Sequence, residues 1–301
     1  MIKKLYKIRT CAVIAVCVAF FISFICLYSK KEDAKAIDEN TALSIWQIDS
    51  FEGGKGSRAG YLQSVGNEFS NKENCYINVV SLSAEAARLN LSDGKIPDII
   101  SYGAGTYGIE SCISNYAVWC RGNYCLLTLD TNSDFSDVNA ENTVINTGKD
   151  NFSGAVALLC GLLNAKTENS TAAYVKLING DYKYLLGTQR DIFRLKTRNV
   201  SFSVKALTVF NDLYQNISIT TGCKNTVYAQ KYVEYLLSKK SDINKIGMFC
   251  DGVKLYDDEM GKCENVSFEY KITYPINEDM KNRINTSVSL GDINMLKDLL
   301  K

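Results

Sequence analysis

The stretch of residues 43–58, LSIWQIDSFEGGKGSR, places a short apolar segment directly before a polar, glycine-rich loop and a helix start. In open α/β folds, backbone N–H groups and polar side chains meet a bound molecule at the carboxyl ends of strands. The stretch supplies an apolar surface and both signs of charge through Trp46, Asp49, Glu52, Lys55 and Arg58. It therefore predicts a ligand-binding loop at the end of a buried strand.

The residues that follow extend this strand into a sheet. Ser57 is expected to cap a helix, because Leu62, Val65 and Phe69 fall at core spacing. Residues 76–81 are expected to form a second strand, residues 83–91 a short helix, and residues 98–102 a third strand. This alternation implies right-handed crossovers and a parallel sheet. The ends of the first and third strands should then lie at one edge.

A second strand-loop-helix junction occurs later in the chain. Residues 117–128 are apolar and extended, with a break at residues 121–123, and residues 182–186 form a strand that ends in GTQR. Thr188 and Gln189 can hydrogen-bond there, and Arg190 carries a fork of donors. The remaining pattern predicts strands at 143–146 and 202–204, and helices at 153–163, 172–178, 229–237 and 292–300. The fold class predicted is α/β.

Composition excludes several classes of function. The chain has 301 residues and no histidine, so His-based triads, His general bases and His-ligated metal sites are excluded. Beyond residue 36 it carries 27 basic and 31 acidic side chains, a net charge of −4. That balance gives no electrostatic footprint for nucleic acid. We expect no metal, no cofactor and no nucleic-acid partner, and we expect a protein that is not an enzyme.

The N-terminal segment predicts export. Residues 1–10 are basic, and residues 11–28 form an apolar run, long enough at about 1.5 Å per residue to cross a bilayer. The basic end favours a body outside the membrane. The sequence AKA at residues 34–36 fits a signal-peptidase site, whereas the long apolar run favours an uncleaved anchor. Residues 1–36 are therefore a signal peptide or a membrane anchor.

Eight cysteines lie in the exported body, and none forms a CxxC pair. Their even number permits disulfides outside the cell without indicating which residues pair. They are equally compatible with small buried hydrophobic side chains.

The glycine-rich loop matches the pattern of a dinucleotide-binding fingerprint, but its position relative to the strands disfavours that function. Residues 54–59, GKGSRA, match G-x-G-x-x-[G/A], but residues 49–53 separate the first glycine from its strand, and no acid ends the second strand. Asp49 and Glu52 can be read as paired catalytic carboxylates or as parts of a solvated loop. Trp46 and Trp119 can be ligand platforms or core aromatics.

Several segments together resemble bacterial extracellular solute-binding proteins of family 1, which deliver sugars to ABC importers. The matching segments occur in the family's order over residues 43–250: IWQIDSFEGGKGSR, KIPDIISYGAG, AVWCRGNYCLL, YKYLLGTQRDIFRLKTRNVSFSV, FNDLYQNISIT and YAQKYVEYLLS. The resemblance implies a type II periplasmic-binding-protein-like fold, in which two α/β lobes are joined by crossing hinge strands and close on a ligand. Between residues 163 and 182 the family carries a longer helical stretch, so the second lobe here is reduced.

The resemblance also implies a division of the chain and a set of binding residues. Residues 37–125 with 206–260 form the first lobe, and residues 126–205 with 261–301 form the second. The implied ligand-binding residues are Trp46, Asp49, Glu52, Arg58, Tyr102, Gly103, Trp119, Arg121, Thr188, Gln189 and Arg190.

Three functions follow from these features. The first is an extracytoplasmic solute-binding protein that carries a carbohydrate-like solute to the permease subunits of an ABC importer. The second is a membrane-anchored surface or sensor protein that has the same fold and no longer serves transport. The third is a nucleotide-dependent enzyme, which the loop spacing disfavours.

Overall fold

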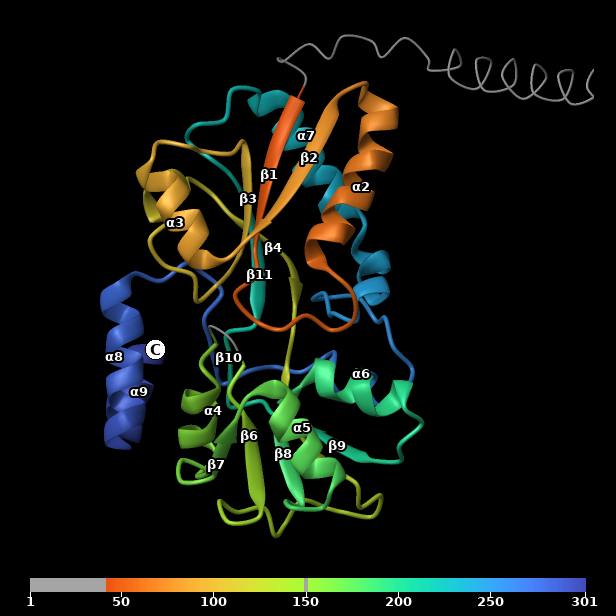
Figure 1. The fold of residues 1–301 in the computed structure, drawn as a ribbon, viewed down its shortest axis with the longest axis vertical. Coiled ribbons are helices and arrows are strands. Elements are labelled where there is room, and N and C mark those ends of the chain that lie inside the picture. Colours follow the sequence, from red (N-terminus) through yellow and green to blue (C-terminus); the bar gives the residue numbers. More distant parts are fainter. Residues whose placement is uncertain (1–41, 149–150) are drawn as a thin grey trace, which may run out of the picture. The chain divides into compact units, whose positions relative to one another are not determined.

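The computed structural model describes residues 42–148 and 151–301. The signal peptide or anchor predicted at residues 1–36 lies outside the described residues. The described part of the chain contains two five-stranded sheets with helices packed against them (Figure 1). We call the parts of the chain around these sheets the first lobe and the second lobe.

The first sheet has the strand order β2-β1-β3-β11-β4. β1 is parallel to β2 and to β3, which confirms the predicted parallel arrangement of the first three strands. β11, which the sequence analysis did not anticipate, runs antiparallel between β3 and β4. The strand bounds are β1 (Ala42–Ile48), β2 (Tyr76–Leu82), β3 (Ile99–Gly103), β4 (Ala117–Arg121) and β11 (Tyr214–Ile219).

Helix α2 (Arg58–Glu73) begins where the sequence predicts. The Ser57 side chain accepts a hydrogen bond from the Gly60 amide at 3.1 Å, and this satisfies one of the unpaired amides of the first turn. The helix ends at Asn74, which adopts the left-handed conformation with φ of 53°. Between these ends the expected apolar side chains are buried against the sheet, among them Leu62, Val65 and Phe69.

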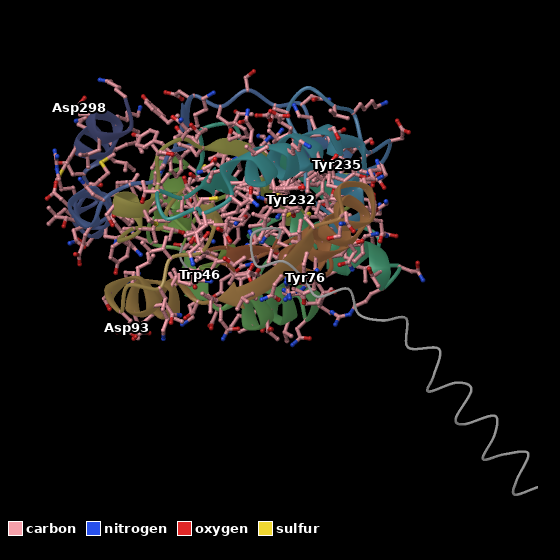
Figure 2. All side chains as sticks on the ribbon, turned by 90° about the horizontal axis from the view of Figure 1, so that it is seen from above. Trp46, Tyr76, Asp93, Tyr232, Tyr235 and Asp298 are labelled. Atoms are coloured by element: carbon pink, nitrogen blue, oxygen red, sulfur yellow. The ribbon has the colours of Figure 1, made fainter. Side chains whose placement is uncertain are left out.

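Helix α7 (Thr226–Ser238) packs beside α2 in the first lobe. Tyr232 is fully buried, and its hydroxyl donates to the Leu62 carbonyl at 3.0 Å (Figure 2). Its ring meets Phe69 edge-on with centroids 5.7 Å apart. The third helix of this lobe, α3 (Ala84–Ser92), is capped by Ser83, whose side chain accepts from the Ala86 amide.

The second sheet has the strand order β7-β6-β8-β5-β9. β6 is parallel to β7 and β8, whereas β5 is antiparallel to β8 and β9. The strands are β5 (Tyr124–Thr128), β6 (Thr143–Asn146), β7 (Lys166–Glu168), β8 (Tyr184–Thr188) and β9 (Ser203–Ala206). The helices are α4 (Ser153–Leu159), α5 (Ser170–Ile178) and α6 (Gln189–Thr197).

Helix α4 is shorter than the segment 153–163 predicted from the sequence. It ends at Leu159, and Gly161 then adopts a φ of 72°. That left-handed conformation is readily available to glycine and turns the chain away from the helix. The apolar residues beyond it still pack into the core, as the burial of Leu162 shows.

The chain passes from one sheet to the other at three places that lie against each other. The first passage is the step from β4 to β5, where the Gly122 amide donates to the Leu213 carbonyl at 2.7 Å. The second contains β10 (Phe210–Asn211), whose Asn211 side chain donates to the Gly122 carbonyl at 3.2 Å. The third follows the 3₁₀ helix η3 (Lys240–Ile246), and there Phe249 pairs with Arg121. These passages are therefore hydrogen-bonded to one another.

The third passage leads into the C-terminal part of the chain. It continues through η4 (Gly261–Cys263) and β12 (Tyr270–Lys271), which pairs with β10. Helix α8 (Glu278–Leu290), which the sequence analysis did not anticipate, and α9 (Ile293–Leu300) pack against each other and against α4 (Figure 1). Asp292 caps α9, which confirms the helix predicted at 292–300. The C-terminal helices therefore belong with the second lobe.

The eight described cysteines are free thiols. Six are buried and the other two partly exposed, so in this structure they act as small apolar side chains. Burial raises the pKa of the Cys120 thiol, which lies in the core of the first lobe. The buried cysteines are Cys75, Cys112, Cys120, Cys125, Cys250 and Cys263.

Asp212, in the second passage between the sheets, carries a buried carboxylate whose effect on stability can be measured as a function of pH. Its carboxylate is 3% exposed and accepts from the Tyr124 hydroxyl at 2.8 Å and from the Phe152 amide at 3.0 Å. Burial raises the pKa of Asp212 to about 6, whereas an unfolded aspartate titrates near 3.9. The native state therefore binds this proton more tightly, and the associated stability is lost as the pH rises through 6.

We expect Asp212→Asn to remove this pH dependence. Between pH 4 and pH 7, the free energy of unfolding of the natural chain should fall relative to that of the variant by about 3 kcal/mol at most. Urea unfolding of both proteins across this range measures the difference. Asp298→Asn, at an exposed helix position, is the control. A difference between the natural chain and Asp212→Asn that stays constant with pH would contradict the assignment.

Candidate functional site

Arg58, at the start of α2, holds the loop after β1 in place. Its side chain is buried and donates to the Gln215 side chain at 2.9 Å and to the Phe51 carbonyl. It also lies 3.1 Å from an Asp49 carboxylate oxygen. Burial lowers the pKa of Arg58, and the Asp49 carboxylate opposes that effect. Because all of these partners belong to the first lobe, Arg58 organises the loop from within.

Asp49 joins the ends of two neighbouring strands. Its carboxylate accepts from the Ser81 hydroxyl at 3.0 Å, near the end of β2, and from the Gln47 side chain at 3.2 Å, near the end of β1. The side chain is 48% exposed, so it keeps acceptor capacity toward solvent while it pairs with Arg58. The carboxylate is therefore both anchored and accessible.

Glu52 makes the contact between the loop after β1 and the second lobe. One of its carboxylate oxygens lies 3.4 Å from the Asn146 amide nitrogen, at the end of β6, and 3.9 Å from Arg190 Nε, at the start of α6. The Gln189 side chain donates to the Glu52 carbonyl at 3.3 Å. Three of the predicted site residues, Glu52, Gln189 and Arg190, are thus brought together from opposite lobes.

Thr188 and Gln189 are hydrogen-bonded within the protein. Thr188 caps α6 in a capping box with Asp191, whose carboxylate accepts from the Thr188 amide at 3.1 Å. Gln189 Oε1 accepts from the Asn123 amide at 2.9 Å, in the first passage between the sheets. Asp191 is fully buried, and burial raises its pKa. These residues fix the position from which Arg190 extends.

The two tryptophans pack within the first lobe. Trp119 is 2% exposed, stacks on Tyr61 with ring centroids 5.8 Å apart, and donates to the Ser101 hydroxyl at 3.0 Å. Trp46 is half-buried in the middle of β1 and packs against the cluster that contains Ile100 (Figure 2). Their contacts are those of core aromatics.

Arg121 lies among the passages between the sheets. Its side chain is 2% exposed, pairs with Asp251 at 2.5 Å through Nε, and donates to the Glu264 carbonyl. The guanidinium also lies over the ring of Phe249, 5.4 Å from its centroid. Arg121 therefore links the first passage to the third.

Tyr102 and Gly103 end β3 beside the loop after β1. The Tyr102 side chain is fully buried, its hydroxyl has no hydrogen-bond partner among the described residues, and burial raises its pKa. A Cβ atom at Gly103 would lie 1.5 Å from the Ser50 hydroxyl oxygen. Glycine at this position is what allows the ends of β1 and β3 to approach each other.

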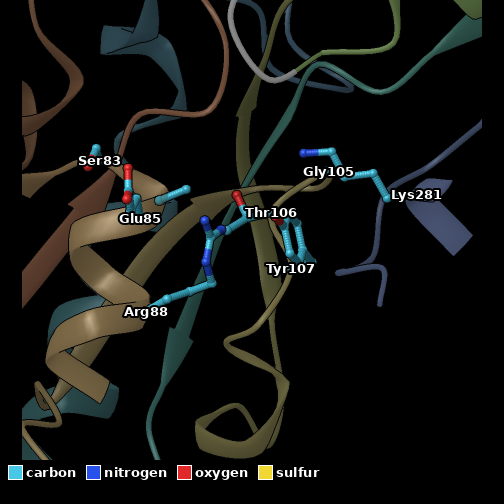
Figure 3. Close-up of a pocket in the computed structure, with 8 residues that line it drawn as sticks. Ser83, Glu85, Arg88, Gly105, Thr106, Tyr107 and Lys281 are labelled. Atoms are coloured by element: carbon cyan, nitrogen blue, oxygen red, sulfur yellow. The ribbon is translucent and has the colours of Figure 1, made fainter. Parts of the chain in front are cut away.

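A pocket of about 210 Å³ opens near the ends of β2 and β3 (Figure 3). None of the residues that line it was among the binding residues predicted from the sequence. Those lining residues that directly follow β2 and β3 could have been predicted from the sequence, because the carboxyl ends of parallel strands meet at the same edge of the sheet as the loop after β1. Lys281 could not have been predicted in this way, since it comes from α8. The lining residues are Ser83, Ala84, Glu85, Arg88, Gly105, Thr106, Tyr107 and Lys281.

Residues 42–148 and 151–301 contain no group of three or more cysteine, aspartate or glutamate side chains arranged to hold a metal ion. In the same residues, every helix is too short or too polar to cross a membrane.

No protein-family model matches the sequence, and no curated protein matches it. Solved structures do share its fold. MalX from Streptococcus pneumoniae, solved in complex with maltopentaose, aligns with a TM-score of 0.54 and 13% identity over 85% of this chain and 98% of its own. The ferric binding protein from Campylobacter jejuni aligns with a TM-score of 0.52 and 13% identity over 85% and 99%.

A third solved structure, a two-component-system protein described as mediating signal transduction, aligns with a TM-score of 0.53 and 12% identity over 75% of this chain and 93% of its own. None of the three is described as an enzyme. The chain thus has the two-lobed, periplasmic-binding-protein-like α/β fold, which confirms the predicted fold class. At these identities the likeness defines the fold alone.

Arg58→Lys tests the anchoring of the loop after β1. Lysine cannot reproduce the fork that contacts Gln215, Asp49 and the Phe51 carbonyl, so we expect the free energy of unfolding to fall by about 1–3 kcal/mol. Arg283→Lys is the matched control, because that side chain is 55% exposed and lies 3.9 Å from its acidic partner. Its effect should stay within about 0.5 kcal/mol. Equal losses in chemical denaturation would refute the anchoring role.

Proposed function

We propose that the chain is an extracytoplasmic solute-binding protein, which carries a carbohydrate-like solute to the permease subunits of an ABC importer. The observation that carries this proposal is the contact of Glu52, in the first lobe, with Asn146, Gln189 and Arg190, in the second. These residues lie at or just beyond the carboxyl ends of strands in two separate sheets. Such strand ends are where open α/β sheets bind ligands.

The chemistry at this contact suits a solute with many hydroxyl groups. The Glu52 carboxylate accepts hydrogen bonds, while Asn146 and Arg190 supply donors from the other lobe. The Arg190 side chain is 39% exposed, and its Nε has no hydrogen-bond partner among the described residues. A polyol that inserts between the lobes can replace the contacts that Glu52 now makes. That MalX was solved with maltopentaose supports a carbohydrate.

The same proposal assigns roles to the rest of the chain. The three passages between the sheets would act as the hinge on which the lobes close. The basic and apolar N-terminal residues would direct export, with the body anchored to the outer face of the membrane or released from it. Asp49 would add an accessible carboxylate at the rim of the site.

A membrane-anchored sensor is the second candidate function. The observation that favours it is the likeness to the two-component-system protein. A sensor of this fold would bind its solute in the same place but would pass the signal on without release to a permease. Copurification of permease subunits with the chain from its own membranes separates the two functions.

A sugar panel tests the proposed ligand. Residues 37–301, which contain the compact unit 40–301, are followed by thermal unfolding with each sugar in excess. Binding at one hundred times Kd should add about 2.7 kcal/mol to the free energy of unfolding, which raises Tm. A dinucleotide that raises Tm, while every sugar fails to, would overturn the proposal.

Glu52→Gln tests whether the solute binds between the lobes. Because it replaces a charged acceptor by a neutral amide, we expect at least a tenfold loss of sugar affinity, or about 1.4 kcal/mol. Glu141→Gln makes the same substitution at an exposed position of the second lobe and should leave the affinity unchanged. Calorimetric titration of both variants measures the difference. If the two bind equally well, the sugar binds elsewhere.

A further inference from the structure

The pocket beside β2 and β3 contains two cationic side chains that contact one aromatic ring. The Arg88 guanidinium carbon lies 4.5 Å from the Tyr107 ring centroid, and Lys281 Nζ lies 4.6 Å from it. Figure 3 shows the ring of Tyr107 between the two side chains. All three side chains are half-buried, so both positive charges are partly removed from water.

Arg88 is held in place while its charge stays available. Its aliphatic stem packs over Gly108, where an added Cβ would lie 2.6 Å from Arg88 Cδ. Among the described residues, its guanidinium forms no ion pair and no hydrogen bond. A positioned guanidinium of this kind retains all of its N–H donors for a bound group.

The start of α3 faces the same pocket. Ser83 already accepts from the Ala86 amide at 3.1 Å, and the helix has nine residues. The amides of Ala84 and Glu85 precede the first hydrogen bond within the helix, and both residues line the pocket. Such amides, together with the positive end of the helix dipole, favour a negative charge.

Thr106 supplies an independent observation. The residue is 2% exposed and lines the pocket, and its Oγ1 has no hydrogen-bond partner among the described residues. Figure 3 places the Thr106 side chain toward Arg88 and the start of α3. A buried hydroxyl without a partner costs free energy, which a bound acceptor would recover.

The charge of the lining is positive overall. Among the residues that line the pocket, Arg88 and Lys281 are cationic and Glu85 is acidic. Arg88 belongs to the first lobe, whereas Lys281 belongs to α8, which packs against α4 of the second lobe. A negatively charged group in the pocket would therefore contact both lobes.

We infer that this pocket is a binding site for a small oxyanion: a phosphate, a sulfate or the carboxylate of a solute. Arg88 and Lys281 neutralise its charge, while the amides at the start of α3 and the Thr106 hydroxyl donate hydrogen bonds to its oxygens. The residues differ from those at the Glu52 contact, so the site does not depend on the proposed sugar. It extends the recognition surface of the chain to an acidic ligand.

The first experiment is a calorimetric titration of the full chain, in non-ionic detergent, with sodium phosphate, sodium sulfate and sodium acetate in separate arms. Sodium chloride at matched ionic strength is the reference. We expect saturable binding of at least one oxyanion, and the arm with the strongest binding identifies the preferred group. Binding that does not exceed the chloride reference in any arm would overturn the inference.

The second experiment locates the site. Arg88→Gln and Lys281→Gln should each weaken oxyanion binding at least tenfold, and Thr106→Val should weaken it about threefold. Glu85→Gln should tighten it, because it removes the opposing carboxylate. Arg283→Gln removes one positive charge from the same helix as Lys281 outside the pocket lining, and it should change affinity less than twofold.

The results of these oxyanion titrations can be distinguished from the results of the sugar-binding experiments. Thermal unfolding without ligand shows that each variant folds, and the affinities of Arg88→Gln and Lys281→Gln are compared with that of the natural chain independently of each other. Unchanged affinity in both Arg88→Gln and Lys281→Gln would refute the site. Oxyanion binding that is lost in these variants supports it, whether or not any sugar binds.

Discussion

The buried guanidinium of Arg58 is the interaction on which the loop after β1 depends. A charge removed from water must be matched by acceptors, and Arg58 finds them in Asp49, Gln215 and the Phe51 carbonyl. Asp49 and Phe51 lie within the loop and Gln215 lies on β11, so the loop has to fold back over the sheet. That fold places Glu52 where it meets the second lobe. The position of the Glu52 carboxylate between the lobes thus follows from the burial of the Arg58 guanidinium in the first lobe.

Buried polar contacts join the passages between the lobes, alongside apolar side chains such as Phe210 and Leu213. Arg121, Asp212 and Gln189 are each buried, and each bonds to backbone or side-chain groups of another passage or lobe. Hydrogen bonds of this kind are directional, so they define a specific arrangement of the three passages. Around them the apolar packing is continuous, because one cluster of buried side chains includes Leu62 of the first lobe and Leu186 of the second.

Strands could be predicted from the sequence where the buried residues are also hydrophobic. β1, β3 and β6 are short apolar runs, and each was found at or within one residue of its predicted bounds. β11 has the opposite character: its residues YQNISI include Gln215, Asn216 and Ser218, all at most 2% exposed. A strand that buries polar side chains cannot be recognised from hydrophobic pattern. β11 was not predicted for that reason, although it lies inside the sheet between β3 and β4.

The same distinction applies to the site. The resemblance to solute-binding proteins placed Glu52, Gln189 and Arg190 at one site, and these three residues do lie in contact. That resemblance could not anticipate that Trp46 and Trp119 pack inside the lobe, since a tryptophan near a strand end has the same sequence signature in either role. Nor could it place Lys281, which reaches Tyr107 from a helix more than 170 residues further along the chain.

Three of the buried polar atoms without partners lie near the carboxyl ends of β1 and β3 in the first sheet. Ser50, Tyr102 and Thr106 each bury a hydroxyl that finds no acceptor or donor among the described residues. In a well-packed protein such groups are few, because each one costs free energy. Departures from that rule are expected where a protein is completed by something it binds. These three hydroxyls lie beside the loop after β1 and the pocket of Arg88, so they support the binding sites proposed for the first lobe by an argument from free energy that does not use the strand topology.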